Sequence, residues 1–257
     1  MKNLIRSECS RLVMRRRTIV ILIISLFAFL FLSFFNSTFG VGFYDPNQTA
    51  RLDSLNFAPF VLRDYHFYFV LVLCPLLVVE SFNRERCSGE YRMIMIRPYS
   101  RAQFYFAKMI SLSLVFGVLI FILWGIATIF GFFVLPHADT TSLFNPNMMY
   151  TTTEAISFSL KFYFVEYLML IGIIGVISGV SLLLPNSLLS YIGSVFFLCG
   201  IGFSVIPLEF LVSSTRCIFD LLLGIGASWH VILYLMAILG IGIGGSYMMF
   251  KHSDYLS

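Results

Sequence analysis

The stretch from Thr18 to Phe35 reads TIVILIISLFAFLFLSFF and carries no charged residue. A continuous apolar run of this length is typical of a helix that crosses the hydrocarbon core of a bilayer. No small-residue cleavage site of the A-x-A type follows it, so we expect a retained span and not a signal peptide.

The composition of the whole chain agrees with a membrane protein. Of its 257 residues, 59% are hydrophobic and only 12% are charged, far from the balance of a soluble domain. The apolar runs are continuous and do not alternate, which favours helices over the strands of a barrel. Spans and their connections use the whole chain, so we expect one transmembrane domain over residues 1–257 and no separate ATPase domain.

Further apolar runs predict an all-α integral membrane protein with six spans, at 18–35, 66–82, 109–135, 158–184, 188–208 and 229–250. Residues 1–17 are basic and weakly amphipathic, which predicts a helix on the inner membrane surface. The stretch Glu209–Ser228 is apolar but broken by charges. It predicts either a re-entrant external hairpin between spans five and six or an apolar surface loop.

The positions of the basic residues predict the orientation. Thirteen of the 17 Lys and Arg fall in residues 1–17, in the loop at 83–107 with Lys108 directly after it, and in the C-terminal tail. Cytoplasmic segments carry such an excess, so we expect both termini in the cytoplasm. Arg15, Arg16 and Arg17 also suit anionic membrane lipid, or direct contact with a cytoplasmic partner.

The internal loop at 83–107 is long, and it mixes charged with apolar residues. Met93, Ile94 and Ile96 are apolar neighbours of Arg92, which a purely solvated loop does not require. Pro98 ends this short segment. Ser100 can then cap the helix of the third span. We therefore predict a short helix that lies parallel to the membrane and presents a docking surface.

This loop resembles a known family. Its residues are similar to the E-x-x-x-G…P-x-S-R…K signature of ABC-2 type permeases, the transmembrane subunits of ATP-binding-cassette transporters, at Glu85, Gly89, Pro98, Ser100, Arg101 and Lys108. The Glu8-containing basic N-terminal helix is also similar to that family. Where the family usually has Thr after the glycine, this chain has Glu90.

The resemblance implies that Glu85–Ile96 is a coupling helix that enters a groove on a separate ATPase. Glu85 and Arg92 would form charge-assisted hydrogen bonds, either with that partner or with the neighbouring N-terminal helix. The implied ATPase-coupling residues are Glu85, Gly89, Glu90, Arg92, Met93, Ile94, Ile96, Pro98, Ser100 and Arg101. It also implies partner ABC ATPases that hold ATP-Mg, a second identical or related permease, and a bacterial plasma membrane. The chain itself would bind no cofactor.

Two features are candidates for a substrate path. Phe27, Phe31 and Phe34 share one face of the first span, which suits an amphipathic substrate if it lines a cleft and otherwise faces lipid or another helix. Glu166 lies inside the fourth span, where a carboxylate indicates either a functional site or a side chain that reaches the outer interface.

Smaller patterns predict local packing. Glu80 and Arg84 are four residues apart and predict an ion pair. Two small-xxx-small pairs predict close helix packing, Gly175 with Gly179 and Gly240 with Gly244.

Several functions lack support in the sequence. There is no H-E-x-x-H motif, no phosphate-binding G-x-x-x-x-G-K-[ST] loop and no nucleic-acid motif, and the five cysteines have no metal-ligand spacing. We expect the permease subunit of an ABC exporter, which is not itself an enzyme. The alternatives are half of a secondary transporter or channel that uses Glu166, and an intramembrane enzyme.

Overall fold

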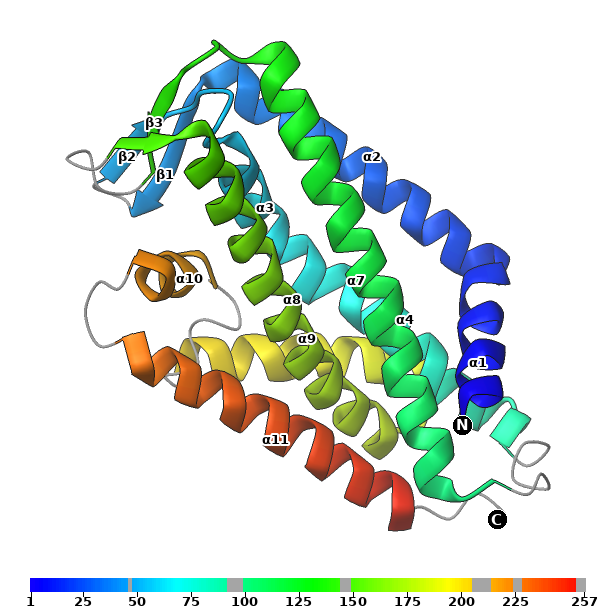
Figure 1. The fold of residues 1–257 in the computed structure, drawn as a ribbon. Helices are drawn as coiled ribbons and strands as arrows, with labels where there is room; N and C mark the ends of the chain where they lie inside the picture. The colour runs from blue at the N-terminus through cyan, green and yellow to red at the C-terminus, as the bar shows by residue number, and fades with distance from the viewer. Residues whose placement is uncertain (46–47, 92–98, 144–148, 205–213, 224–227, 253–257) are drawn as a thin grey trace.

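The computed structural model describes residues 1–45, 48–91, 99–143, 149–204, 214–223 and 228–252, and most of them are helical (Figure 1). The N-terminal half contains α1 (Lys2–Met14), α2 (Arg16–Phe39), β1 (Val41–Asp45), β2 (Gln48–Arg51), α3 (Phe57–Tyr68), η1 (Phe69–Leu73), α4 (Cys74–Val79), η2 (Glu80–Arg84) and α5 (Glu85–Cys87). The rest contains α7 (Arg101–Val134), β3 (Thr140–Ser142), β4 (Met149–Thr151), α8 (Thr152–Leu183), α9 (Ser187–Ser204), α10 (Ser214–Leu223) and α11 (Ser228–His252).

Five helical stretches are long and apolar enough to cross a membrane: Arg16–Phe39, Phe57–Cys87, Arg101–Val134, Thr152–Leu183 and Val231–His252. A shorter apolar helix covers Ser187–Gly202, inside the predicted fifth span. The chain is therefore a multi-pass helical membrane protein.

The second membrane-spanning stretch begins earlier than the sequence predicted. Residues up to about 65 were expected in an external loop, but α3 starts at Phe57. The Asp53 carboxylate accepts hydrogen bonds of 2.9 Å from the backbone N–H groups of Leu55 and Asn56, and this turn leads into the helix. Phe57 and Val61 are fully buried, so tertiary packing favours a helix here.

The same stretch contains two π-helical segments, η1 and η2, on either side of α4. Pro75 lies in the first turn of α4, directly after η1. Proline has no N–H and its ring clashes with the preceding turn, so a wider π turn lets the helix continue past it.

The two β-hairpins lie at one end of the bundle, while α1, α5, the start of α7 and the end of α11 lie at the other (Figure 1). At the hairpin end, the Ser54 N–H donates to the Pro136 carbonyl over 3.2 Å. At the opposite end, Arg101 donates to the Lys251 carbonyl over 2.8 Å. The segments that were predicted to be cytoplasmic therefore gather at one end.

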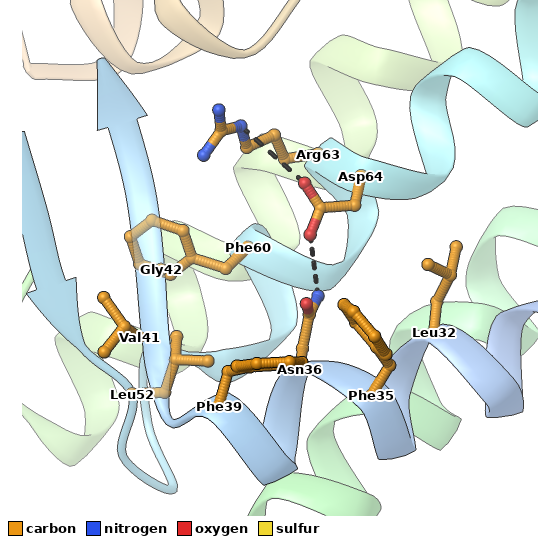
Figure 2. Close-up of a pocket in the computed structure, with 10 residues that line it drawn as sticks. All are labelled: Leu32, Phe35, Asn36, Phe39, Val41, Gly42, Leu52, Phe60, Arg63 and Asp64. Atoms are coloured by element: carbon orange, nitrogen blue, oxygen red, sulfur yellow. Dashed lines mark hydrogen bonds and ion pairs between the residues drawn. The ribbon is translucent and has the colours of Figure 1, made fainter. Parts of the chain in front are cut away.

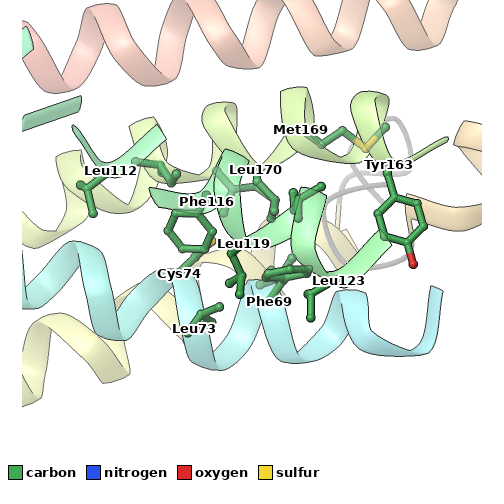
Figure 3. Packing of buried hydrophobic residues seen from close by; sticks show 14 of the residues in the cluster. Phe69, Leu73, Cys74, Leu112, Phe116, Leu119, Leu123, Tyr163, Met169 and Leu170 are labelled. Atoms are coloured by element: carbon green, nitrogen blue, oxygen red, sulfur yellow. The ribbon is translucent and has the colours of Figure 1, made fainter. Parts of the chain in front are cut away.

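The core lies where η1, α4, α7 and α8 meet (Figure 3). Phe69, Cys74, Phe116 and Leu170 are fully buried there, and the Phe69 and Phe116 ring centroids are 6.3 Å apart. With hydrocarbon outside, burial adds little free energy, so close packing and polar contacts between helices must hold these spans together.

Between the fifth and sixth predicted spans, residues 214–223 form α10. Its Ile218 and Phe219 are fully buried, and the Phe219 ring lies 4.8 Å from that of Phe162 on α8. This part is thus a packed helix and not a surface loop. Residues 205–213 and 224–227, which would complete a hairpin, lie outside the described residues.

Close packing of α8 on α11 depends on small residues, but not on all those the sequence indicated. A Cβ on Gly175 would come within 2.9 Å of the Gly242 backbone, and one on Gly179 would meet Ser246 at 3.5 Å. The predicted pair Gly240 and Gly244 is wrong for this contact, because a Cβ on either would meet nothing within 4 Å.

Gly242 and Gly244, two of the glycines of α11, allow a matched test of this packing. Gly242→Val should push α11 away from α8, because its Cβ would lie 3.0 Å from the Gly172 carbonyl oxygen before the two methyl groups are added. We expect a loss of about 1–3 kcal/mol in unfolding free energy, measured by thermal denaturation in detergent. Gly244→Val is the control, and an equal loss there would contradict this packing.

Candidate functional site

A cluster of charged side chains joins α1, the end of the second span and α7. We call it the charge cluster, and its members are Glu8, Arg11, Arg15, Glu85, Glu90 and Lys108. It contains three acids and three bases, so its formal charge is zero.

Lys108 occupies the centre of the charge cluster and has no exposed surface. Its Nζ donates to Glu8 Oε2 and to the Ser81 carbonyl, each over 3.1 Å, and it also donates to Glu85. The rings of Phe82, Tyr91 and Phe104 surround the ammonium, the nearest with its centroid 4.9 Å away. An ammonium in such a dry site needs these acceptors and ring faces to remain charged.

The two arginines of α1 close the charge cluster on its open side. Arg11 donates to Glu8 and Glu85 over 2.7 Å each, and Arg15 donates to Glu85 over 2.7 Å and to Glu90 over 3.4 Å. Burial alone would lower the pKa of Arg11, but attraction to Glu85 and Glu8 outweighs it and raises the pKa. Arg11 therefore stays a cation, as the two buried carboxylates require.

The side chain of Glu85 is not placed to contact a docked protein directly. Its side chain is almost completely buried against α1 and α7 and faces the interior of this chain. Any effect of Glu85 on a docked protein must therefore act through the position of the loop that begins there. Glu90, in contrast, is partly exposed at the edge of the charge cluster.

Other residues of the family signature have roles in the local backbone structure. Gly89 has φ +76°, a left-handed conformation that disfavours side chains, and it turns the chain after α5. Ser100 and Gln103 form a reciprocal capping box at the start of α7, which confirms the predicted cap. The predicted residues Arg92, Met93, Ile94, Ile96 and Pro98 lie outside the described residues.

A second polar site lies inside the membrane-spanning region. His66 on α3 and Glu166 on α8 are each about 1% exposed, and Nδ1 of the ring lies 2.6 Å from Oε1 of the carboxylate. Glu166 is thus deeply buried against another helix, and the outer-interface alternative is wrong. The short contact gives each polar group a hydrogen-bond partner, which a site away from water requires.

Most partners in the two sites were not predicted. The contact of Glu85 with the N-terminal helix was one of two alternatives, and Arg11 and Arg15 confirm it. The N-terminal helix was otherwise assigned to the membrane surface, and His66 to the start of the second span. The available signal was the requirement that an ionisable residue in a span must have a partner. Applied to Glu166 and Lys108, it predicts that partners exist but not which residues they are. The predicted Glu80–Arg84 ion pair is confirmed.

A pocket of about 490 Å³ opens near the hairpin end, between α2, β1 and α3. Figure 2 shows apolar side chains along it, among them Leu32, Phe35 and Phe60, and a polar edge. At that edge Asn36 donates to the Asp64 carboxylate over 2.7 Å, and Arg63 approaches the same carboxylate. The pocket can therefore take an apolar group that carries a polar end.

The predicted aromatic face of the first span lies on the outside of the chain. Phe27, Phe31 and Phe34 are each about two-thirds exposed along α2. Among the described residues the stripe is largely uncovered, so it is available to lipid or to another subunit.

A family model described as ABC-2 family transporter protein matches residues 4–198. This match covers most of the chain. The chain belongs to the ABC-2 transporter family. A search of curated proteins found no match.

The matched part of this ABC-2 family member includes every residue of the charge cluster and both residues of the His66–Glu166 pair. Helices α10 and α11 lie beyond the match. The family's membrane components serve in transport and are generally not catalytic themselves.

Replacement of the central cation tests the charge cluster. Lys108→Met should leave Glu8 and Glu85 buried with too few cations. We expect about 3–5 kcal/mol of destabilisation and easier proteolysis of α1, measured by thermal denaturation and limited digestion in detergent. Lys161→Met removes an exposed lysine of α8 as the control. Wild-type stability in Lys108→Met would show that the charge cluster does not hold α1.

Proposed function

We propose that this chain is the membrane-spanning permease subunit of an ATP-driven ABC exporter. The observation that carries the proposal is the charge cluster, because it fixes both ends of the loop between the second and third spans. Glu85 lies where the second span ends, and Lys108 lies in the first turns of α7. A loop anchored in this way can pass a displacement to the two spans that it joins.

In the proposed topology the chain crosses the bilayer six times, with α9 as the fifth span. Its 18 residues measure about 27 Å, close to the hydrocarbon thickness. Helix α1 lies at the cytoplasmic interface, and α10 belongs to a re-entrant external hairpin. The predicted single helix over residues 85–96 is wrong, because α5 ends at Cys87 and Gly89 is left-handed, so we place the coupling helix at residues 90–96. Both termini are cytoplasmic, and the membrane is the bacterial plasma membrane.

Coupling follows from this arrangement. A separate ATPase holds ATP-Mg and receives the coupling helix, while this chain has no ATPase site. Closure of the ATPases on ATP would push the loop, and Glu85 would transmit that movement to α1 and α7 through Arg11, Arg15 and Lys108. The substrate must bind the two resulting states with different affinities, because otherwise nothing is driven.

We further propose that two such subunits, identical or related, line the pathway. The exposed stripe of Phe27, Phe31 and Phe34 would face it, and the pocket that Phe35 lines would lie on a neighbouring face of the same helix. An apolar surface that ends in Asn36, Arg63 and Asp64 suits an amphipathic substrate such as a peptide, drug or lipid-like molecule.

The alternative is half of a secondary transporter or channel driven by a gradient. The His66–Glu166 pair favours it, because a buried carboxylate hydrogen-bonded to a histidine can carry a proton. A purely structural contact between α3 and α8 would need the same geometry but would not need an ionisable acid.

The coupling proposal is tested by charged substitutions in the loop. Met93→Asp with Ile94→Asp should bury unpaired charge in the ATPase contact, so the variant should insert but lose bound ATPase and substrate-stimulated ATP hydrolysis. Co-purification and ATPase assays in proteoliposomes measure this. Met93→Leu with Ile94→Leu is the matched control. If the Asp variant still binds the ATPase and still shows substrate-stimulated ATP hydrolysis, the loop is neither the coupling helix nor a cytoplasmic docking site.

The His66–Glu166 pair separates the two functions. Glu166→Gln keeps the shape and one hydrogen bond but cannot take up a proton, so the exporter proposal expects near wild-type ATP-driven transport. Transport assays in proteoliposomes, with ATP or with an imposed proton gradient, measure this. Glu166→Leu is the packing control, and it should destabilise the fold because the His66 ring loses its hydrogen bond to the carboxylate. Loss of gradient-driven transport in Glu166→Gln would favour the alternative.

A further inference from the structure

Beside the charge cluster lies a smaller pocket with an excess of positive charge. Its volume is about 220 Å³, and its walls are formed by Arg15, Arg16, Arg17, Glu80, Arg84 and Glu90. It lies at the junction of α1 and α2, next to the end of the second span.

Ion pairs within the chain account for four of these six side chains. Arg84 pairs with Glu80, and Arg15 pairs with Glu90 and Glu85. Among the side chains that the structure describes, neither Arg16 nor Arg17 has an ion-pair partner, and both are exposed. The pocket therefore has two guanidinium groups whose charge is not balanced by this chain.

Guanidinium groups recognise phosphate through paired N–H donors, and basic pockets at the cytoplasmic ends of spans bind anionic lipid headgroups. Arg16 and Arg17 are the first residues of α2, the first span. A phosphate here would lie at the depth of the inner-leaflet headgroups.

The surface next to the pocket distinguishes a lipid from a free phosphate. The side chains of Ile19, Val20 and Ile23 on α2 are about half exposed, starting two residues after Arg17. Acyl chains can lie along this apolar face while the phosphate stays with the arginines. A free phosphate, or an acidic side chain of an ATPase, would use the arginines and leave that face bare.

We propose that this pocket binds the phosphodiester headgroup of an anionic phospholipid, with Arg16 and Arg17 as its ligands. The carboxylates of Glu80 and Glu90 also line the pocket, so Arg84 and Arg15 must stay paired with them for the phosphate to be accepted. The bound lipid would then lie against the charge cluster through Arg15.

The test uses the full chain, purified from mixed vesicles of phosphatidylglycerol and phosphatidylcholine, and measures co-purified lipid by native mass spectrometry. Wild type should prefer phosphatidylglycerol. Arg16→Gln with Arg17→Gln should reduce this preference by about 30-fold, since each basic residue near an anionic surface contributes about a factor of five. Lys2→Gln with Arg6→Gln removes the same charge from exposed positions of α1 and should keep the preference.

An equal reduction in the Lys2/Arg6 control would overturn the proposal, because the effect would then be general electrostatics. Displacement of phosphatidylglycerol by millimolar inorganic phosphate would overturn it in favour of a free-phosphate site. An unchanged lipid preference together with lost ATPase binding would overturn it in favour of a protein contact. If the glutamine variant does not insert, Arg16→Lys with Arg17→Lys replaces it. That variant should reduce the preference because it loses the paired donors, and an unchanged preference would overturn the proposal.

Discussion

The buried ammonium of Lys108 constrains the end of the bundle opposite the two hairpins. A charge without exposed surface is tolerated only with close partners, and here those partners come from two other segments, Glu8 on α1 and Glu85 after the second span. The N-terminal helix, the exit of the second span and the entry of α7 must therefore meet at one point. This requirement explains why α1 packs on α7 with Leu4 and Leu12 buried, although its composition alone suggests a helix on a membrane surface.

Long spans were predictable from the sequence because lipid requires continuous apolar helices. The helices that contain residues 18–35, 109–135 and 158–184 follow from that requirement. The start of α3 was not predictable, since Asp53, Asn56 and Arg63 make the segment look like a loop, and burial against neighbouring helices favours the helix. The α8–α11 contact shows the same limit. Small-residue spacing identified Gly175, but only the rotation of α11 decides that Gly242 faces it and Gly244 does not.

The candidate site was predictable in part. The resemblance to the family signature identified Glu85, Gly89, Ser100 and Lys108, and the structure explains Gly89 by its backbone and Ser100 by its cap. Long-range partners were not predictable, because Arg11 and Glu85 are 74 residues apart and His66 and Glu166 are 100 residues apart. The spacing of residues within one helix does not show which other helix that helix contacts. The general requirement that buried charges be paired predicts that such contacts exist, and the fold alone decides which residues make them.

The His66–Glu166 pair and the charge cluster hold the second span at two points. His66 ties its first half to α8, and Glu85 ties its last turn to α1 and α7. The stretch between them contains both π-helical segments and Pro75, where backbone hydrogen bonding is least regular. A helix fixed at both ends can respond to a displaced loop only by a change between those ends. The π segments are where such a change costs least, because a π turn can convert to an α turn by shifting one hydrogen-bond register. In the proposed coupling, the second span would therefore carry movement from the charge cluster towards the core while the contact of His66 with Glu166 holds.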